Sequence, residues 1–150
     1  MRRLSPVILA LALGALLAGC AAATQKRSTL AENLARLCEG ARAEVEALGL
    51  PGDKGFAVVA PTATIGQQLA KDVGKLRGTT ERERKQVRSL SRYLAFYYGE
   101  LSAGAKLYRV GQADAYRITV ERATPSLVSA EALATRMGAP ECAVRPFPDA

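Results

Sequence analysis

The sequence predicts a mainly α-helical protein, a small bundle of four to five helices that follows a cleaved signal peptide. Three observations support this fold class. Apolar residues recur at steps of three and four over several long segments, Thr-x-x-Glu capping boxes begin two of them, and glycine or proline separates them. One short β pair is an open alternative for two brief apolar runs, and with it the fold would be α+β.

The first helix is expected over residues 29–48. Thr29 and Glu32 form a capping box at its start, and Gly49 follows as a C-terminal cap. Cys38 lies at the edge of the apolar stripe, where it can reach a neighbouring segment. The stripe consists of Leu30, Leu34, Leu37, Ala41, Val45 and Leu48.

A second helix is expected after Pro61, with Thr62 or Thr64 as its cap. Two internal glycines, Gly66 and Gly74, cost this helix roughly 1 kcal/mol each relative to alanine. Packing against other elements must therefore stabilise it. Its apolar stripe is Ile65, Leu69, Val73 and Leu76.

The longest helix is expected to begin at the capping box of Thr80 and Glu83. Its buried face is Val87, Leu90, Leu94, Tyr98 and Leu101. Small residues follow on another side, namely Ala95, Gly99 and Ala103. Because small side chains let helices approach closely, we expect the segment 112–124 to dock on these three residues.

The segment 112–124 fits two periodicities. Tyr116, Ile118 and Val120 alternate with polar residues as in a strand, whereas Ala113, Tyr116, Val120 and Ala123 fit a helical stripe. Gly111 before the segment and Pro125 after it bound a stretch of suitable length for a helix, which favours the helical interpretation. As a strand, this segment would pair with the short apolar run 56–60, which is too brief to classify and can be extended. A last short helix is expected over 129–137, capped by Ser129.

The first twenty residues have the parts of a secretory signal in order. Arg2 and Arg3 are followed by an apolar run over 4–17 and then by small residues. The sequence Leu17-Ala18-Gly19-Cys20 resembles the lipobox of bacterial lipoproteins, and this resemblance covers only the signal and the cysteine. An uncleaved membrane-spanning helix over 4–23 is the alternative, because about twenty apolar residues suffice to cross a bilayer.

The lipoprotein resemblance implies cleavage before Cys20 and attachment of palmitate-type acyl chains to this cysteine. Ala21, in place of an aspartate, implies the outer membrane, with the protein facing the periplasm. The chain then divides into a signal peptide (1–19), a lipidated tether (20–27) and a single helical domain (28–150). In that oxidising compartment the two remaining cysteines, Cys38 and Cys142, are expected to form a disulfide.

The composition argues against an enzyme. The chain has no histidine, which excludes His-based triads and the usual zinc sites. No glycine-rich phosphate loop, Gly-x-Ser-x-Gly motif or Asp-rich calcium loop occurs. The carboxylate pairs Glu44 with Glu46 and Glu81 with Glu83 are two residues apart, so on a helix they point away from each other. We therefore expect no catalysis, cofactor or metal.

The region 71–92 is strongly basic. It contains eight lysines and arginines against Asp72, Glu81 and Glu83. Such a region attracts anionic surfaces, although many helices carry a solvated basic face without a ligand. The aromatic cluster of Tyr93, Phe96, Tyr97 and Tyr98 follows; such clusters mostly form core, but Tyr93 and Phe96 lie off the main stripe. The candidate surface is therefore Arg84, Lys85, Arg88, Arg92, Tyr93 and Phe96.

These features predict a non-enzymatic accessory or scaffold lipoprotein whose partner is another envelope protein. The alternative is a binder of an anionic envelope ligand, such as a lipid head group, lipopolysaccharide or peptidoglycan, through the basic residues of 71–92. Nucleic acid is not an expected partner in this compartment.

Overall fold

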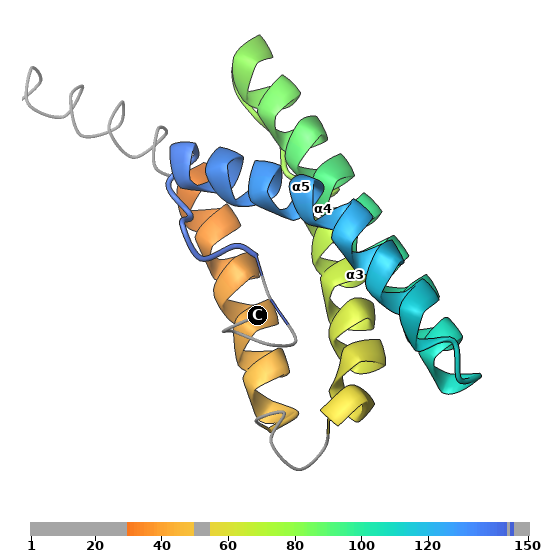
Figure 1. Ribbon diagram of the computed structural model, residues 1–150. Helices are drawn as coiled ribbons and strands as arrows, with labels where there is room; N and C mark the ends of the chain where they lie inside the picture. Colours follow the sequence, from red (N-terminus) through yellow and green to blue (C-terminus); the bar gives the residue numbers. More distant parts are fainter. Residues whose placement is uncertain (1–29, 50–54, 144, 146–150) are drawn as a thin grey trace, which may run out of the picture. The chain divides into compact units, whose positions relative to one another are not determined.

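The computed structural model describes residues 30–49, 55–143 and 145, and within these residues it is an assembly of helices (Figure 1). In chain order they are a helix over 30–47, the 3₁₀ helix η1 (Gly55–Val58), and the α-helices α3 (Val59–Lys75), α4 (Glu81–Arg109) and α5 (Ala113–Arg136). This part of the chain contains no strand. The predicted mainly α-helical class is confirmed, and the alternative with a short β pair is wrong.

Several predictions concern residues outside the described ranges. They are the signal peptide over 1–19, the lipidated Cys20, the tether over 20–27 and the cap at Thr29. These stay predictions. None of the described helices is both long enough and apolar enough to cross a membrane.

The helix over 30–47 buries the predicted side. Leu34 and Ala41 lie in the core, and Cys38 is buried beside them. The amide of Gly49 donates to the carbonyl of Glu46, and the φ of Gly49 is +87°. Glycine adopts this left-handed conformation without steric cost, as the predicted C-terminal cap requires.

Helix α3 begins earlier than predicted. The run 56–60 is neither extended nor a loop, because η1 leads directly into the first turn of α3. Thr62 does not cap the helix, since its hydroxyl donates to the carbonyl of Val58, 2.7 Å away. Pro61 is tolerated as the third residue of α3, because a backbone N–H in the first turn has no partner within the helix.

Helices α3 and α4 pack closely side by side. Gly66 faces the ring of Tyr98, and Gly74 faces Ser91. The Ser91 hydroxyl donates to the carbonyl of Ala70, 2.8 Å away. The two glycines that weaken α3 as an isolated helix therefore allow its close approach to α4, and the predicted dependence of α3 on packing has this physical origin.

The start and buried face of α4 agree with the prediction. The Thr80 hydroxyl accepts from the Glu83 amide at 3.1 Å, and the Glu83 carboxylate accepts from the Thr80 amide at 2.9 Å. All five residues of the predicted stripe are buried, namely Val87, Leu90, Leu94, Tyr98 and Leu101.

Helix α5 docks on a different side of α4 from the one predicted. Its Tyr116 and Thr119 lie over Gly104, beside the buried Leu101 and Ala105. The predicted docking residues are Ala95, Gly99 and Ala103. Of these, Ala95 and Ala103 are exposed, and a Cβ added at Gly99 would have no neighbour within 4 Å. Small residues permit a close approach, but they do not determine on which side of α4 the next helix packs.

Helix α5 is continuous, so the prediction of two helices, one over 112–124 and one over 129–137, is wrong. Pro125 lies inside α5, and Figure 1 shows that the helix bends near its middle. Ser129 does not cap a new helix, because its hydroxyl donates to the Pro125 carbonyl, 2.8 Å away. Since proline lacks an N–H and its ring crowds the preceding turn, a bend is the physical alternative to termination.

An aromatic cluster fixes η1 against the α4–α5 connection. The rings of Phe56 and Tyr108 are stacked, with centroids 3.6 Å apart, and Tyr116 packs edge-on against Phe56 at 5.0 Å. Burial, and to a smaller extent the nearby Tyr108, raises the pKa of the Tyr116 phenol. Phe56 is 52 positions from Tyr108 and 60 from Tyr116 in the sequence, so no local pattern predicts this cluster.

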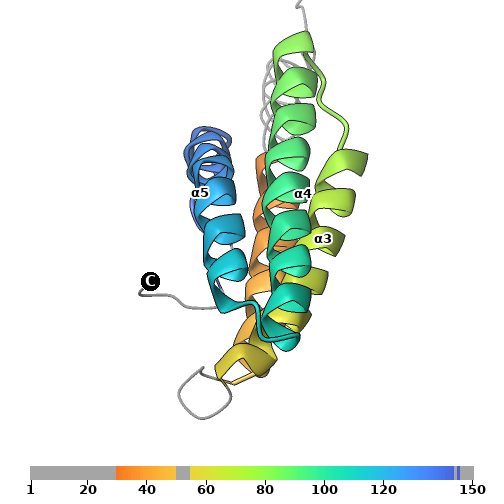
Figure 2. The ribbon, with the colours of Figure 1, turned by 45° about the vertical axis from the view of Figure 1, so that its right-hand side comes forward.

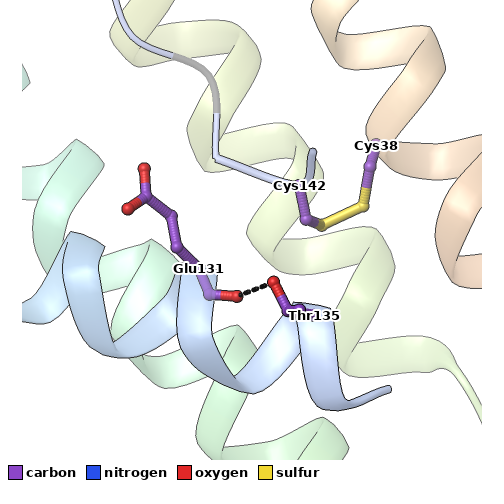
Figure 3. Close-up of a disulfide and its surroundings, with 4 residues drawn as sticks. All are labelled: Cys38, Glu131, Thr135 and Cys142. Carbon is purple, nitrogen blue, oxygen red and sulfur yellow. Dashed lines mark hydrogen bonds between the residues drawn. A yellow bond between two sulfur atoms is a disulfide. The ribbon is translucent and has the colours of Figure 1, made fainter. Parts of the chain in front are cut away.

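The segment after α5 returns to the helix over 30–47. Figure 3 shows the disulfide between Cys142 in this segment and Cys38 on that helix, with Cα atoms 4.5 Å apart. Both cysteines are buried. Gly138, at φ +90°, turns the chain after α5, and Arg145 donates to the Glu131 carboxylate at 2.7 Å. The predicted pairing of the cysteines agrees with this geometry.

Candidate interaction face on helix α4

One side of α4 is exposed along most of its length. In Figure 2, α4 stands in front, between α5 and α3. We call the exposed stripe between these neighbours the α4 face. It follows helical steps of three and four residues, and its members are exposed except for the half-buried Gly99. They are Lys85, Arg88, Arg92, Ala95, Phe96, Gly99, Ala103 and Lys106.

The structure brings together four of the six predicted surface residues. Lys85, Arg88, Arg92 and Phe96 follow one another along the α4 face. Arg84 and Tyr93 are nine residues apart, which is half a turn around the helix at 3.6 residues per turn. They therefore lie at opposite edges of the exposed arc and do not belong to one compact site.

The aromatic cluster divides between core and surface in the predicted way. Tyr97 and Tyr98 are buried at 5% and 0% exposure, whereas Tyr93 and Phe96 are exposed at 37% and 46%. Phe96 is flanked on the α4 face by Arg92 and Gly99. Phenylalanine and arginine are both enriched at the contact surfaces of protein interfaces.

The positive charge of the α4 face is only partly balanced. Glu81 pairs with Arg84 at 3.2 Å and with Lys85 at 4.0 Å. No carboxylate of the described residues lies within 4.0 Å of Arg88 or Arg92. These two guanidinium groups are therefore available to an anionic group from outside.

Glu83 does not neutralise the α4 face, because its carboxylate belongs to the helix cap. The Thr79 hydroxyl donates to it at 2.7 Å, and the amides of Thr79 and Thr80 donate at 2.7 and 2.9 Å. The pKa of Glu83 is lowered to about 2, chiefly by the hydrogen bond from the Thr79 side chain and next by the hydrogen bond from the Thr80 backbone.

Helix α3 adds a shallow hollow beside the α4 face. It is lined by Gln67, Ala70, Lys71, Ser91 and Ala95. Lys71 is exposed at its rim. On the same helix, Lys75 pairs with Asp72 at 2.6 Å. The pKa of the Asp72 carboxyl is lowered chiefly by the hydrogen bond from Lys75 and next by the hydrogen bond from Gln68. Lys71 is therefore the cation of α3 that lines this hollow.

Another shallow groove separates the helix over 30–47 from α3. Its floor includes Leu37, Ile65 and Leu69, and Arg36 and Asp72 lie at its rim. Across the described part of the chain, no three cysteine, aspartate or glutamate side chains gather in a group that could hold a metal ion.

No protein-family model, curated protein or solved structure matches this chain.

Proposed function

We propose that this protein is a lipid-anchored lipoprotein of the bacterial cell envelope that acts as a non-enzymatic interaction module. In this proposal Cys20 carries the lipid, the outer membrane holds the anchor, and the bundle faces the periplasm. The α4 face is the surface that meets another envelope protein.

The exposure of Phe96 carries this proposal, because it lies among small residues and follows two arginines that form no ion pair within the described part of the chain. Phe96 exposes 46% of its surface on the side of α4 that neither α3 nor α5 covers, in a row with exposed cations and small residues, so that an apolar side chain and positive charge share one face. Arg92 lies about one turn before Phe96 on the same face, and Arg88 about two turns before it. Aromatic side chains, phenylalanine included, and arginine are enriched at protein interfaces.

Photocrosslinking in bacterial cells that express the full chain tests the interaction. We expect Phe96→benzoylphenylalanine to yield a discrete protein adduct. The matched control, Ile118→benzoylphenylalanine, places the same probe on α5, at a side chain that is 57% exposed. The adduct should disappear in the Arg88→Glu, Arg92→Glu double variant. Equal adducts at both positions, or none at Phe96, would contradict the proposal.

The anchor is tested separately by labelling with radioactive palmitate. We expect the wild-type chain to incorporate label and to fractionate with membranes, and Cys20→Ser to lose both properties. Two acyl chains attach a protein stably, because each buried methylene contributes about 0.8 kcal/mol. Unlabelled protein in the soluble fraction of wild-type cells would contradict the lipoprotein assignment.

A second candidate function is binding of an anionic envelope ligand, such as a lipid head group, lipopolysaccharide or peptidoglycan. The absence of a carboxylate beside Arg88 and Arg92 in the described structure favours it. Sedimentation with anionic vesicles or with peptidoglycan sacculi tests this function. Binding should fall steeply with salt and be lost in the Arg88→Glu, Arg92→Glu variant.

A further inference from the structure

We infer that the partner of the α4 face is an acidic amphipathic helix, which lies along α4 with small or apolar side chains at its centre. This inference rests on the proposed function and deepens it, because it names the chemistry of the partner. It depends on three properties of the α4 face: its shape, its charge and its mixture of small and aromatic side chains.

The centre of the α4 face is shaped for another helix. Ala95, Gly99 and Ala103 recur every four residues, and a Cβ added at Gly99 would meet nothing within 4 Å. Helices whose contact residues are small can approach each other closely. The same type of contact already exists inside the protein, where Gly66 receives Tyr98 and Gly104 receives Tyr116. Phe96 stands beside this open row as an apolar anchor.

The charge of the α4 face selects an acidic partner. Cations lie on both sides of the small residues, with Lys85, Arg88 and Arg92 before them and Lys106 after them. From Lys85 to Lys106 the face spans about 32 Å at 1.5 Å per residue. A partner helix of similar length, with carboxylates opposite these two cationic ends, would neutralise both. Opposite charges at the rim of an interface increase specificity and the rate of association.

A second copy of this chain is a poor occupant of the α4 face. In a parallel pair each cation would meet its own equivalent. In an antiparallel pair centred on Gly99, Lys106 would lie opposite Arg92 of the second copy, because the two positions are equally far from Gly99. Both arrangements bring like charges together, which disfavours self-association.

A lipid surface fits the centre of the α4 face less well than a helix does. Peripheral membrane helices bind through bulky apolar side chains, and their affinity increases with the apolar area that they bury. Here Phe96 is the only large apolar side chain among the eight residues of the face, and alanine and glycine contribute little apolar area. Small residues favour contact with another backbone instead.

Fluorescence anisotropy with labelled helical peptides and the purified full chain tests this inference. The probe is a peptide of about 22 residues, matching the ~32 Å face, with alanine and leucine at its centre, three glutamates at one end and one at the other. A second version has the glutamate cluster at the opposite end, so that both helix orientations are sampled. A peptide with lysine in place of glutamate is the negative control, and buffer at about 0.15 M salt limits long-range attraction.

Two kinds of variant distinguish docking from general electrostatics. We expect Arg88→Glu with Arg92→Glu to weaken binding of one acidic peptide about tenfold or more, and Gly99→Leu to do the same without any change of charge. Arg82→Glu is the matched control: it reverses a charge on the same helix, but lies roughly 80° around α4 from Arg92 and should leave affinity within about twofold. Circular dichroism checks that each variant is folded.

Three results would overturn the inference: equal affinity for the acidic and lysine peptides, undiminished binding in Gly99→Leu, or binding to phosphatidylglycerol vesicles with none to either acidic peptide. The photocrosslinking experiment separates this failure from a failure of the proposed function. A protein adduct at Phe96 together with negative peptide results would reject only the acidic helix. No adduct at Phe96 would reject the interaction module itself.

Discussion

Gly66 on α3 lies directly against the ring of Tyr98 on α4. A Cβ added at Gly66 would overlap three atoms of this ring, Cγ, Cδ1 and Cε1. The ring cannot move aside easily, because Tyr98 is completely buried. The Gln67 side chain also donates to the carbonyl of Tyr98 at 3.3 Å. Glycine at position 66 therefore fixes the distance between the two helices.

Gly66→Ala should destabilise the protein although alanine favours helix formation. We expect the free energy of unfolding to fall by about 1–3 kcal/mol, because the new methyl group overpacks the contact with Tyr98. Gly40→Ala is the matched control, since nothing lies within 4 Å of a Cβ at that position. It should raise the free energy of unfolding by about 0.5–1 kcal/mol. Urea denaturation followed by circular dichroism measures both, and a stabilising Gly66→Ala would contradict the packing argument.

Two neighbouring residues of α4, Ala103 and Gly104, test on which side of this helix α5 packs. A Cβ at Gly104 would approach Cδ2 of Tyr116 to 2.9 Å, and this ring is held by Phe56 and Tyr108. We expect Gly104→Leu to lower the free energy of unfolding by about 1–3 kcal/mol or more. Ala103→Leu adds a similar bulk to the exposed α4 face and should change the free energy of unfolding by less than about 0.5 kcal/mol. Equal effects in urea denaturation would mean that α5 does not occupy the Gly104 side.

Local signals in the sequence predict what local interactions determine. The start of α4 follows from Thr80 and Glu83, which bond each other across one turn. Its buried stripe follows from the helical period, and the end of the helix over 30–47 follows from Gly49. The exposure of Phe96 was predictable for the same reason, because its angular position on α4 lies off the stripe.

The features that sequence reasoning missed depend on distant residues. Pro125 normally ends a helix, but burial of Leu127 and the residues after it stabilises α5 beyond the bend. The side of α4 that receives α5 depends on where Tyr116 finds its partners, Phe56 and Tyr108, and no local pattern connects these three rings. Thr62 resembled a cap, but η1 extends the helical path before it. Tertiary packing overrides local propensity at each of these places.

The disulfide should make a large contribution to stability. Cys38 and Cys142 are separated by 104 positions, and the chain-entropy model assigns a closed loop of about 100 residues a stabilisation near 4.7 kcal/mol. We expect reduction, or Cys38→Ala with Cys142→Ala, to lower the free energy of unfolding by several kcal/mol in urea denaturation. The wild-type protein, unfolded without reductant, should show no thiol at either position when treated with iodoacetamide. Alkylation of both cysteines under those conditions would contradict the pairing.

The capping box should make the stability of α4 depend on acid pH. The Glu83 carboxyl has a pKa of about 2 in the folded protein, against an ordinary value of 4.5, so folding favours its ionised form. Its stabilising effect is complete above pH 4.5 and is lost as the pH falls towards 2. We expect Glu83→Gln to unfold at lower urea concentration than the wild type at pH 6, and the difference to shrink as the pH is lowered to about 2. Thr80→Ala, which keeps the carboxylate, should cost about 1 kcal/mol. Carbon-13 NMR of the Glu83 side chain gives the titration directly, and a midpoint near 4.5 would show that the cap hydrogen bonds do not hold the carboxylate in solution.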